Sequence, residues 1–276
     1  MQVTNKALIF IIISGLLLVS ACAERTQPVE LRFAAVYGNA DVSCRVPAGN
    51  VQLTDLRFFV HDISLIDDSG NASPVQLLDD DTWQNSRVAL LDFEDGQGSC
   101  LNGSAATNTS VRGKVRAATG GGSYRGVTFT VGVPDDANHG DPMIASPPLD
   151  QLSMHWHWLS GYKFLRAGVT GDTDSFWIHL GSSHCDGSIG AGIRCNSPNR
   201  VIVRIEKFDP QKERVALDLQ ELFAGISLQD GVHSDCSSGP AEHDCAAPFL
   251  ALGIPFGHSQ SLQEPQSTVF KSVLAR

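Results

Sequence analysis

Residues 51–66 read VQLTDLRFFVHDISLI, a stretch rich in aromatic and β-branched residues that ends one residue before the turn sequence Asp68-Ser69-Gly70-Asn71. A run of this kind, bounded by turn residues, predicts a β-strand. The same pattern continues on both sides of this stretch: short apolar segments alternate with clusters of Gly, Asn, Asp and Pro. No long helical period appears. The chain is therefore predicted to be all-β.

Further segments with this pattern are predicted strands: residues 29–37, 75–78, 88–93, 126–133, 152–168, 175–180, 201–208 and 214–219. Short helices are expected at residues 219–224 and 248–252, a polar surface loop at 102–119 and a loosely held tail after residue 257. No internal repeat or linker is visible. These features predict a single antiparallel β-sandwich-like domain with long loops, spanning residues 22–276, of which 22–30 form a short tether.

The N-terminus predicts export. Residues 7–19, ALIFIIISGLLLV, form an apolar run of signal-peptide length that follows Lys6 and ends at Val19-Ser20-Ala21-Cys22. Small residues directly before a cysteine are typical of a lipoprotein signal, here residues 1–21, after which Cys22 carries the lipid. The alternatives are an uncleaved anchor or an ordinary secretory signal. Because Ala23 is not an aspartate, we expect a lipid-anchored protein of the outer membrane, facing the periplasm or the cell surface.

The cysteines fit an oxidising compartment. Seven are present, and removing lipidated Cys22 leaves an even set of six that could form three disulfides in any of fifteen pairings. The short separations suggest local bridges within Cys185/Cys195 and Cys236/Cys245, which would leave Cys44 with Cys100. The competing interpretation is a thiolate metal site, but the chain contains no C-x-x-C and no C-x-x-C-H haem motif.

Composition and missing motifs narrow the function. A formal net charge of −10 with few clustered Lys or Arg residues argues against nucleic-acid binding. G-x-S-x-G, H-E-x-x-H and a P-loop are absent, so we expect a binding protein and no enzyme. A secreted hydrolase using a carboxylate pair stays open. The acidic turns at residues 78–81 and 95–96 also leave open a calcium- or carbohydrate-binding β-sandwich.

The densest group of chemically distinctive residues is Met154-His155-Trp156-His157-Trp158. On a strand, the Met and the two Trp side chains would share one face and the two histidines the other. One interpretation is an aromatic core strand with two surface histidines. The other is a metal site, because further histidines lie in or just beyond predicted strands, at His61, His139 and His179. Imidazole and thioether ligands suit copper, particularly Cu(I).

Several segments together resemble the MbnP-type copper-binding proteins: LRFFVHD, VALLDFEDGQGSC, GVTFTVGVPDDANHGDP, MHWHWLSGYKFLR, HLGSSHC and PNRVIV. The resemblance spans roughly residues 31–270, and its most specific element is W-x-W followed by SGYKF. In that family the first Trp of W-x-W is oxidised to kynurenine by a partner dihaem enzyme of the MauG/bacterial peroxidase superfamily. The resemblance therefore implies a single copper ion, and it implies that Trp156 is the modified residue.

The same resemblance implies a ligand set. Indole binds metals poorly because its nitrogen lone pair belongs to the aromatic system, whereas opening the ring leaves an arylamine that can donate. With it, His61 and His139 are the expected imidazole ligands, and His179 and Met154 are reserves. His157 and His184 depart from the family pattern. They leave open a second, weaker metal site at the surface. His155, His157 and His184 could equally be surface residues without a metal.

Overall fold

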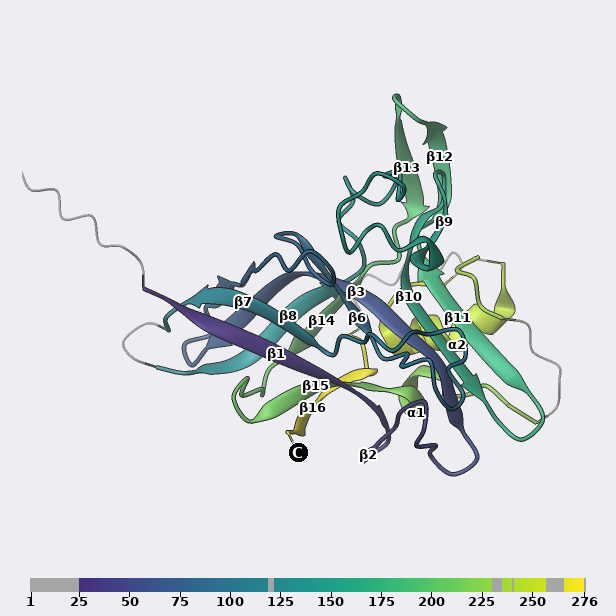
Figure 1. The fold of residues 1–276 in the computed structure, drawn as a ribbon, viewed down its shortest axis with the longest axis horizontal. Helices are drawn as coiled ribbons and strands as arrows, with labels where there is room; N and C mark the ends of the chain where they lie inside the picture. The colour runs from purple at the N-terminus through teal and green to yellow at the C-terminus, as the bar shows by residue number, and fades with distance from the viewer. Residues whose placement is uncertain (1–24, 119–121, 230–234, 240, 257–265, 276) are drawn as a thin grey trace, which may run out of the picture.

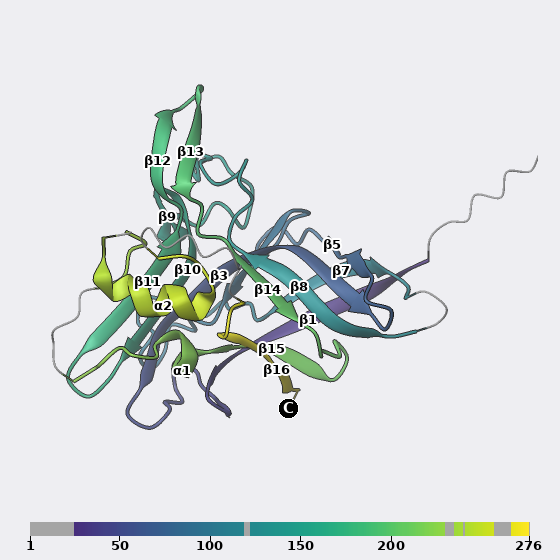
Figure 2. The ribbon, with the colours of Figure 1, turned by 180° about the vertical axis from the view of Figure 1, so that it is seen from behind.

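The computed structural model describes residues 25–118, 122–229, 235–239, 241–256 and 266–275. The strands form two large sheets that face each other and a separate two-stranded hairpin that projects from one end (Figures 1 and 2). The predicted signal peptide and Cys22 lie outside the described residues. Among the described residues, no helix is long and apolar enough to span a membrane.

The first sheet has the order β16-β15-β1-β7-β5, with β2 added at the end of β1. Its strands are β1 (Thr26–Tyr37), β2 (Ala40–Asp41), β5 (Gln76–Leu77), β7 (Ser110–Arg116), β15 (Glu213–Asp218) and β16 (Phe270–Leu274). The pair β1–β15 is parallel, whereas the other printed pairings of this sheet are antiparallel. Among the strands that the structure describes, the sandwich is therefore antiparallel apart from the β1–β15 pair.

The second sheet has the order β11-β10-β3-β8-β14, with β4 and β6 on β3 and β9 on β10. Its strands are β3 (Gln52–Asp67), β4 (Ala72–Pro74), β6 (Val88–Asp92), β8 (Tyr124–Val131), β9 (His155–His157), β10 (Gly161–Thr170), β11 (Ser175–Gly181) and β14 (Val201–Ile205). The projecting hairpin is β12 (Ser183–Ser188) with β13 (Gly192–Ser197). Short helices complete the fold: η2 (Leu152–Met154), α1 (Leu219–Leu222), η3 (His243–Cys245) and α2 (Ala246–Leu252).

Phenylalanine rings join the two sheets. Phe33 of β1 meets Phe58 of β3 and Phe129 of β8 edge to face, and Phe270 of β16 meets the same two rings. Phe58 and Phe129 are almost fully buried. Each ring buried in this way stabilises the fold by about 1.5–3 kcal/mol relative to an exposed one. The alternation of the predicted strands thus forms the apolar interior of a sandwich.

One edge of strand β3 pairs with two different strands along its length, and we call the point where the partner changes the fork. The candidate site lies at this end of the sheet. Its residues up to Phe58 pair with β10, and from Val60 onward they pair with β8. The opposite edge carries β6 across the same stretch. Because β8 and β10 part here, the loop after β8, the β9 strand and the β12–β13 hairpin rise together at this end of the molecule (Figure 1).

Several sequence expectations need correction. The expected polar loop at 102–119 contains β7, where Val111 and Val115 point inward. The tail expected to be loosely held contains β16, which pairs with β15. Residues 26–30 of the expected tether belong to β1. In each case the segment is ordered by pairing with a strand that is distant in the sequence.

The three disulfides confirm the expected set. Cys44 joins Cys100 across 56 residues, whereas the other two bridges close loops of 10 and 9 residues, Cys185–Cys195 and Cys236–Cys245. The local bridge Cys185–Cys195 ties the two strands of the projecting hairpin. With all six cysteines bonded in this way, a thiolate metal site is excluded for them. The disulfides fit a protein of an oxidising compartment.

Candidate metal centre at the W-x-W corner

The W-x-W motif lies in a hairpin and not in one long strand. The expected strand 152–168 is wrong: η2 leads into β9, a turn follows, and β10 returns antiparallel with Gly161 opposite His157. The chain reverses because Gly161 adopts a φ of +75°, and a Cβ there would lie 2.4 Å from the Asn138 carbonyl oxygen. Trp158 consequently sits in the turn, 42% exposed. It does not share a strand face with Trp156.

Trp156 lies half-buried against the end of β11. Its ring reaches over Gly181, where a Cβ would come within 2.5 Å of the indole. The Lys163 ammonium lies 5.8 Å from the ring centroid on a neighbouring strand. Trp156 also lines a pocket of about 310 Å³, together with His157, Ser160, Ser183 and His184. The motif residue therefore borders open volume rather than the sandwich core.

His139 lies beside the motif. The preceding residue, Asn138, is fully buried and accepts a hydrogen bond from the Tyr162 backbone N–H at 3.1 Å. This contact ties the loop after β8 to the start of β10. His139 Nδ1 then lies 3.1 Å from the Trp158 carbonyl oxygen, and its Nε2 lies 3.5 Å from Cys195 Sγ. That sulfur is in a disulfide, so it is no thiolate ligand.

His61 lies deeper, at the fork itself. It is 5% exposed on β3, opposite Val88 of β6 and Thr130 of β8. Its Nδ1 is 2.9 Å from the Asp62 carboxylate, and its Nε2 is buried without a hydrogen-bond partner. Burial lowers the pKa of His61, and the nearby cations of Arg200 and Arg87 add to this. The structure brings His139 to the W-x-W motif through the Trp158 carbonyl, whereas His61 lies on β3 between β6 and β8.

Two other histidines have a buried Nε2 without a hydrogen-bond partner. The His155 ring packs edge-on against Tyr162, with centroids 4.9 Å apart, and burial together with the charges of His157 and Lys163 lowers its pKa. His179 stands on β11 two residues before Gly181, and burial lowers its pKa to about 4, helped by the charges of Arg166 and Lys163. A neutral imidazole with a free nitrogen is the form that binds a metal.

Met154 belongs to the apolar core. It is 0% exposed and part of the main hydrophobic cluster, at the end of η2. Packing in the core is sufficient to account for a methionine at this position. Its role as a reserve thioether ligand stays a prediction.

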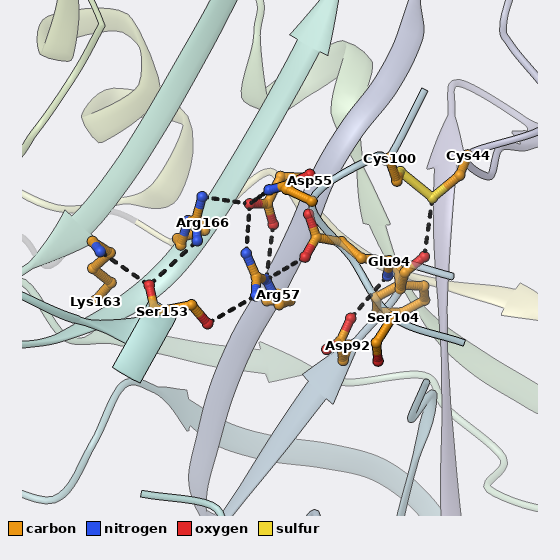
Figure 3. Close-up of polar contacts among 12 residues, drawn as sticks. Cys44, Asp55, Arg57, Asp92, Glu94, Cys100, Ser104, Ser153, Lys163 and Arg166 are labelled. Atoms are coloured by element: carbon orange, nitrogen blue, oxygen red, sulfur yellow. Dashed lines mark hydrogen bonds and ion pairs between the residues drawn. A yellow bond between two sulfur atoms is a disulfide. The ribbon is translucent and has the colours of Figure 1, made fainter. Parts of the chain in front are cut away.

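A buried ion network beside the motif was not foreseen from the sequence. Asp55 is 0% exposed and forms ion pairs of 2.8 Å with both Arg57 and Arg166, while Arg57 Nε lies 2.7 Å from Glu94 (Figure 3). Burial raises the pKa of Glu94 to about 8, and that of neighbouring Asp92 to about 6. At neutral pH Glu94 therefore keeps its proton. The alternation of Asp55 and Arg57 on one strand was the available signal.

The acidic turn at residues 78–81 is explained by its own hydrogen bonds. Asp80 Oδ1 accepts the backbone N–H groups of Thr82, Trp83 and Gln84, and its Oδ2 accepts from Arg112. A carboxylate used in this way is an ordinary turn former. No observation at this turn supports the calcium-binding alternative.

The fold and this corner define a disulfide-bonded β-sandwich protein with an aromatic and imidazole site at the end of one sheet. The family model of MbnP matches residues 26–238, and the chain belongs to the MbnP family. Among solved structures, it is similar to MbnP from Methylosinus trichosporium, with 30% identity and a TM-score of 0.80 over 91% of this chain and 100% of that chain. A search of curated proteins finds no match.

Proposed function

We propose that this protein binds a single copper ion at the W-x-W corner, most readily as Cu(I), and takes part in copper homeostasis without catalysing a reaction. The observation that carries the proposal is that His61, His155 and His179 each have a buried imidazole nitrogen without a hydrogen-bond partner, His155 being the residue directly before Trp156. Leaving such groups unpaired costs about 1–3 kcal/mol each, which a bound metal would repay. Nitrogen donors suit copper better than they suit calcium or magnesium.

The first ligand is kynurenine formed from Trp156. In this conversion two oxygen atoms, supplied by one dioxygen molecule or by two peroxide molecules that each leave a water, add across the indole C2–C3 bond, which breaks. Water then releases the formyl carbon as formate, and the ring nitrogen becomes an arylamine able to donate. The resemblance assigns this step to a dihaem enzyme of the MauG/bacterial peroxidase superfamily, acting in the same exported compartment.

The remaining ligands are imidazoles. We propose His139 and His61, with His179 as the reserve. His139 contacts the motif directly through the Trp158 carbonyl oxygen. His179 faces the side of β11 that the Trp156 ring covers, since it lies two residues before Gly181 on the same strand. Family membership supports copper as the metal.

The proposed cellular location is inferred from the N-terminal sequence and the disulfides. We propose that Cys22 carries a lipid that anchors the protein to the outer membrane after residues 1–21 are removed. Three disulfides support an oxidising compartment. Anchoring would hold the copper site at a membrane surface, where copper could be received or passed on.

The test compares two aromatic variants made together with the dihaem enzyme. Trp156→Phe should keep the fold, at a cost of about 1–3 kcal/mol for the smaller ring, and lose tight copper binding. Trp158→Phe should keep most of it, since this side chain is 42% exposed in the turn. Peptide mass spectrometry should show Trp156 gaining one oxygen atom and losing one carbon atom. Equal copper binding by both variants, or by unmodified protein, would overturn the proposal.

A separate series of histidine variants tests the proposed copper ligands. His61→Ala, His139→Ala and His179→Ala should each leave Trp156 conversion intact, because oxidation of the ring need not require bound metal. The first two should weaken copper binding in a competition assay with a Cu(I) chelator. A loss confined to His179→Ala would replace His61 by His179 in the ligand set.

A further inference from the structure

The two tryptophans of the motif pose a problem of selectivity. Trp158 is 42% exposed in a turn, whereas Trp156 is half-buried against Gly181 and borders the pocket. Exposure alone would make Trp158 the easier target for an oxidant. If Trp156 is the residue converted, the protein must hold it in a defined place.

Lys163 is placed to do this. Its ammonium donates to the Ser153 carbonyl at 3.0 Å and to the His155 carbonyl at 3.4 Å, and it lies 5.8 Å from the centroid of the Trp156 ring. One side chain therefore contacts the backbone on the N-terminal side of the tryptophan and the indole itself. A cation near an aromatic face is attracted by the ring, by about 0.5–2 kcal/mol.

The buried ion network also contacts the segment before Trp156, at Ser153. Arg57 Nη1 donates to Ser153 Oγ at 3.0 Å, and Arg166 Nη1 donates to the Ser153 carbonyl at 3.3 Å (Figure 3). Both guanidiniums are fixed by Asp55, and Arg57 also by Glu94. Three cations from two neighbouring strands thus converge on the residue three positions before Trp156. Ser153, although exposed, is therefore held by three cationic side chains.

We propose that Lys163, supported by the Asp55–Arg57–Arg166 ion network, is the positioning residue that holds Trp156 for conversion and so selects it over Trp158. The inference rests on the proposed function, because it concerns the same oxidation. Lys163 acts on the backbone of β9 and on the orientation of the indole, and the oxidant is the peroxide or dioxygen used by the haem enzyme.

The experiment compares Lys163→Met with Lys271→Met, both made together with the dihaem enzyme. Methionine keeps an apolar stem and removes the donors. Lys271 is the matched control: its ammonium donates to Asp218 and to the Gly38 carbonyl, both at 2.6 Å, in the other sheet. Lys163→Met should slow Trp156 conversion by about tenfold or more, as small misplacements of a reacting group do. It should also raise the share of oxidation found on Trp158. Lys271→Met should change neither, whatever it costs in stability.

Two further measurements keep the outcomes distinct. Hydrogen–deuterium exchange on unmodified protein should be faster for the peptide that contains residues 153–157 in Lys163→Met, but not in Lys271→Met. Lys163→Arg, which restores the cation and its donors, should recover the preference for Trp156. If wild-type Trp156 is never converted, the proposed function fails. If it is converted and Lys163→Met matches wild type in rate and in the Trp156 share, the positioning role alone is overturned.

Discussion

Glu94→Gln gives the sharpest test of the buried ion network. Glu94 is fully buried, and burial, with the negative charge of Asp55, raises its pKa from the ordinary value of 4.5 to about 8. The folded protein therefore keeps this proton at neutral pH, whereas the unfolded chain releases it. The stability that the protonated carboxyl contributes is fully present below pH 4.5 and is lost as the pH rises towards 8.

The magnitude follows from the size of this shift. One proton bound only by the folded state changes the free energy of unfolding by about 1.4 kcal/mol per pH unit, so wild type loses about 2 kcal/mol between about pH 6 and pH 8 through this group. Glutamine has the same shape and stays neutral. Relative to wild type, Glu94→Gln should gain about 2 kcal/mol over this range, or about 4–8 °C in Tm.

Urea unfolding followed by circular dichroism across this pH range measures the effect. Glu206→Gln is the control, because its hydrogen bond to Arg204 holds the pKa of Glu206 below its usual range and the carboxylate is ionised throughout. A difference between Glu94→Gln and wild type that stays constant over the range would refute a buried, protonated Glu94.

Three further predictions concern the disulfides, the hairpin and the anchor. Replacing Cys44 and Cys100 by Ser should lower the free energy of unfolding by about 4 kcal/mol, the chain-entropy value for a loop of this length, and denaturant titration without reductant checks it. Gly161→Ala should destabilise the protein by about 1–3 kcal/mol, because alanine at a φ of +75° is strained and its Cβ meets the Asn138 carbonyl; unchanged Tm and copper affinity would contradict this. Cys22→Ser should move the protein from the membrane fraction to the soluble fraction, and membrane association equal to wild type in fractionation would remove the lipid-anchor prediction.

Local sequence patterns were sufficient where a strand packs directly into the core. Residues 51–66 predicted β3 almost to the residue, because aromatic and β-branched side chains both favour extended backbone and supply the buried Phe58. They were insufficient for β7, whose valines alternate with polar residues and glycine, since its order comes from pairing with β1. Strand pairing is a property of two distant segments, and one segment cannot report it.

For the candidate site, too, the sequence predicted some features and only the tertiary structure showed the others. The sequence by itself marked Trp156 by the W-x-W motif and His139 by the family resemblance as candidates, and the cysteine spacing indicated the three bridges that the structure contains. Only the tertiary structure decided that Gly161 reverses the chain, so that Trp158 leaves the strand face of Trp156. It alone showed the fork on β3 at which His61 lies.

The ion network is the clearest product of tertiary structure. Asp55 and Arg57 lie on β3, Glu94 follows β6, and Arg166 lies on β10. These charges are tolerated inside the protein because each finds a partner from another strand, which no local pattern encodes. Sequence thus determined which residues can carry the chemistry, and the packing of distant strands decided which of them meet.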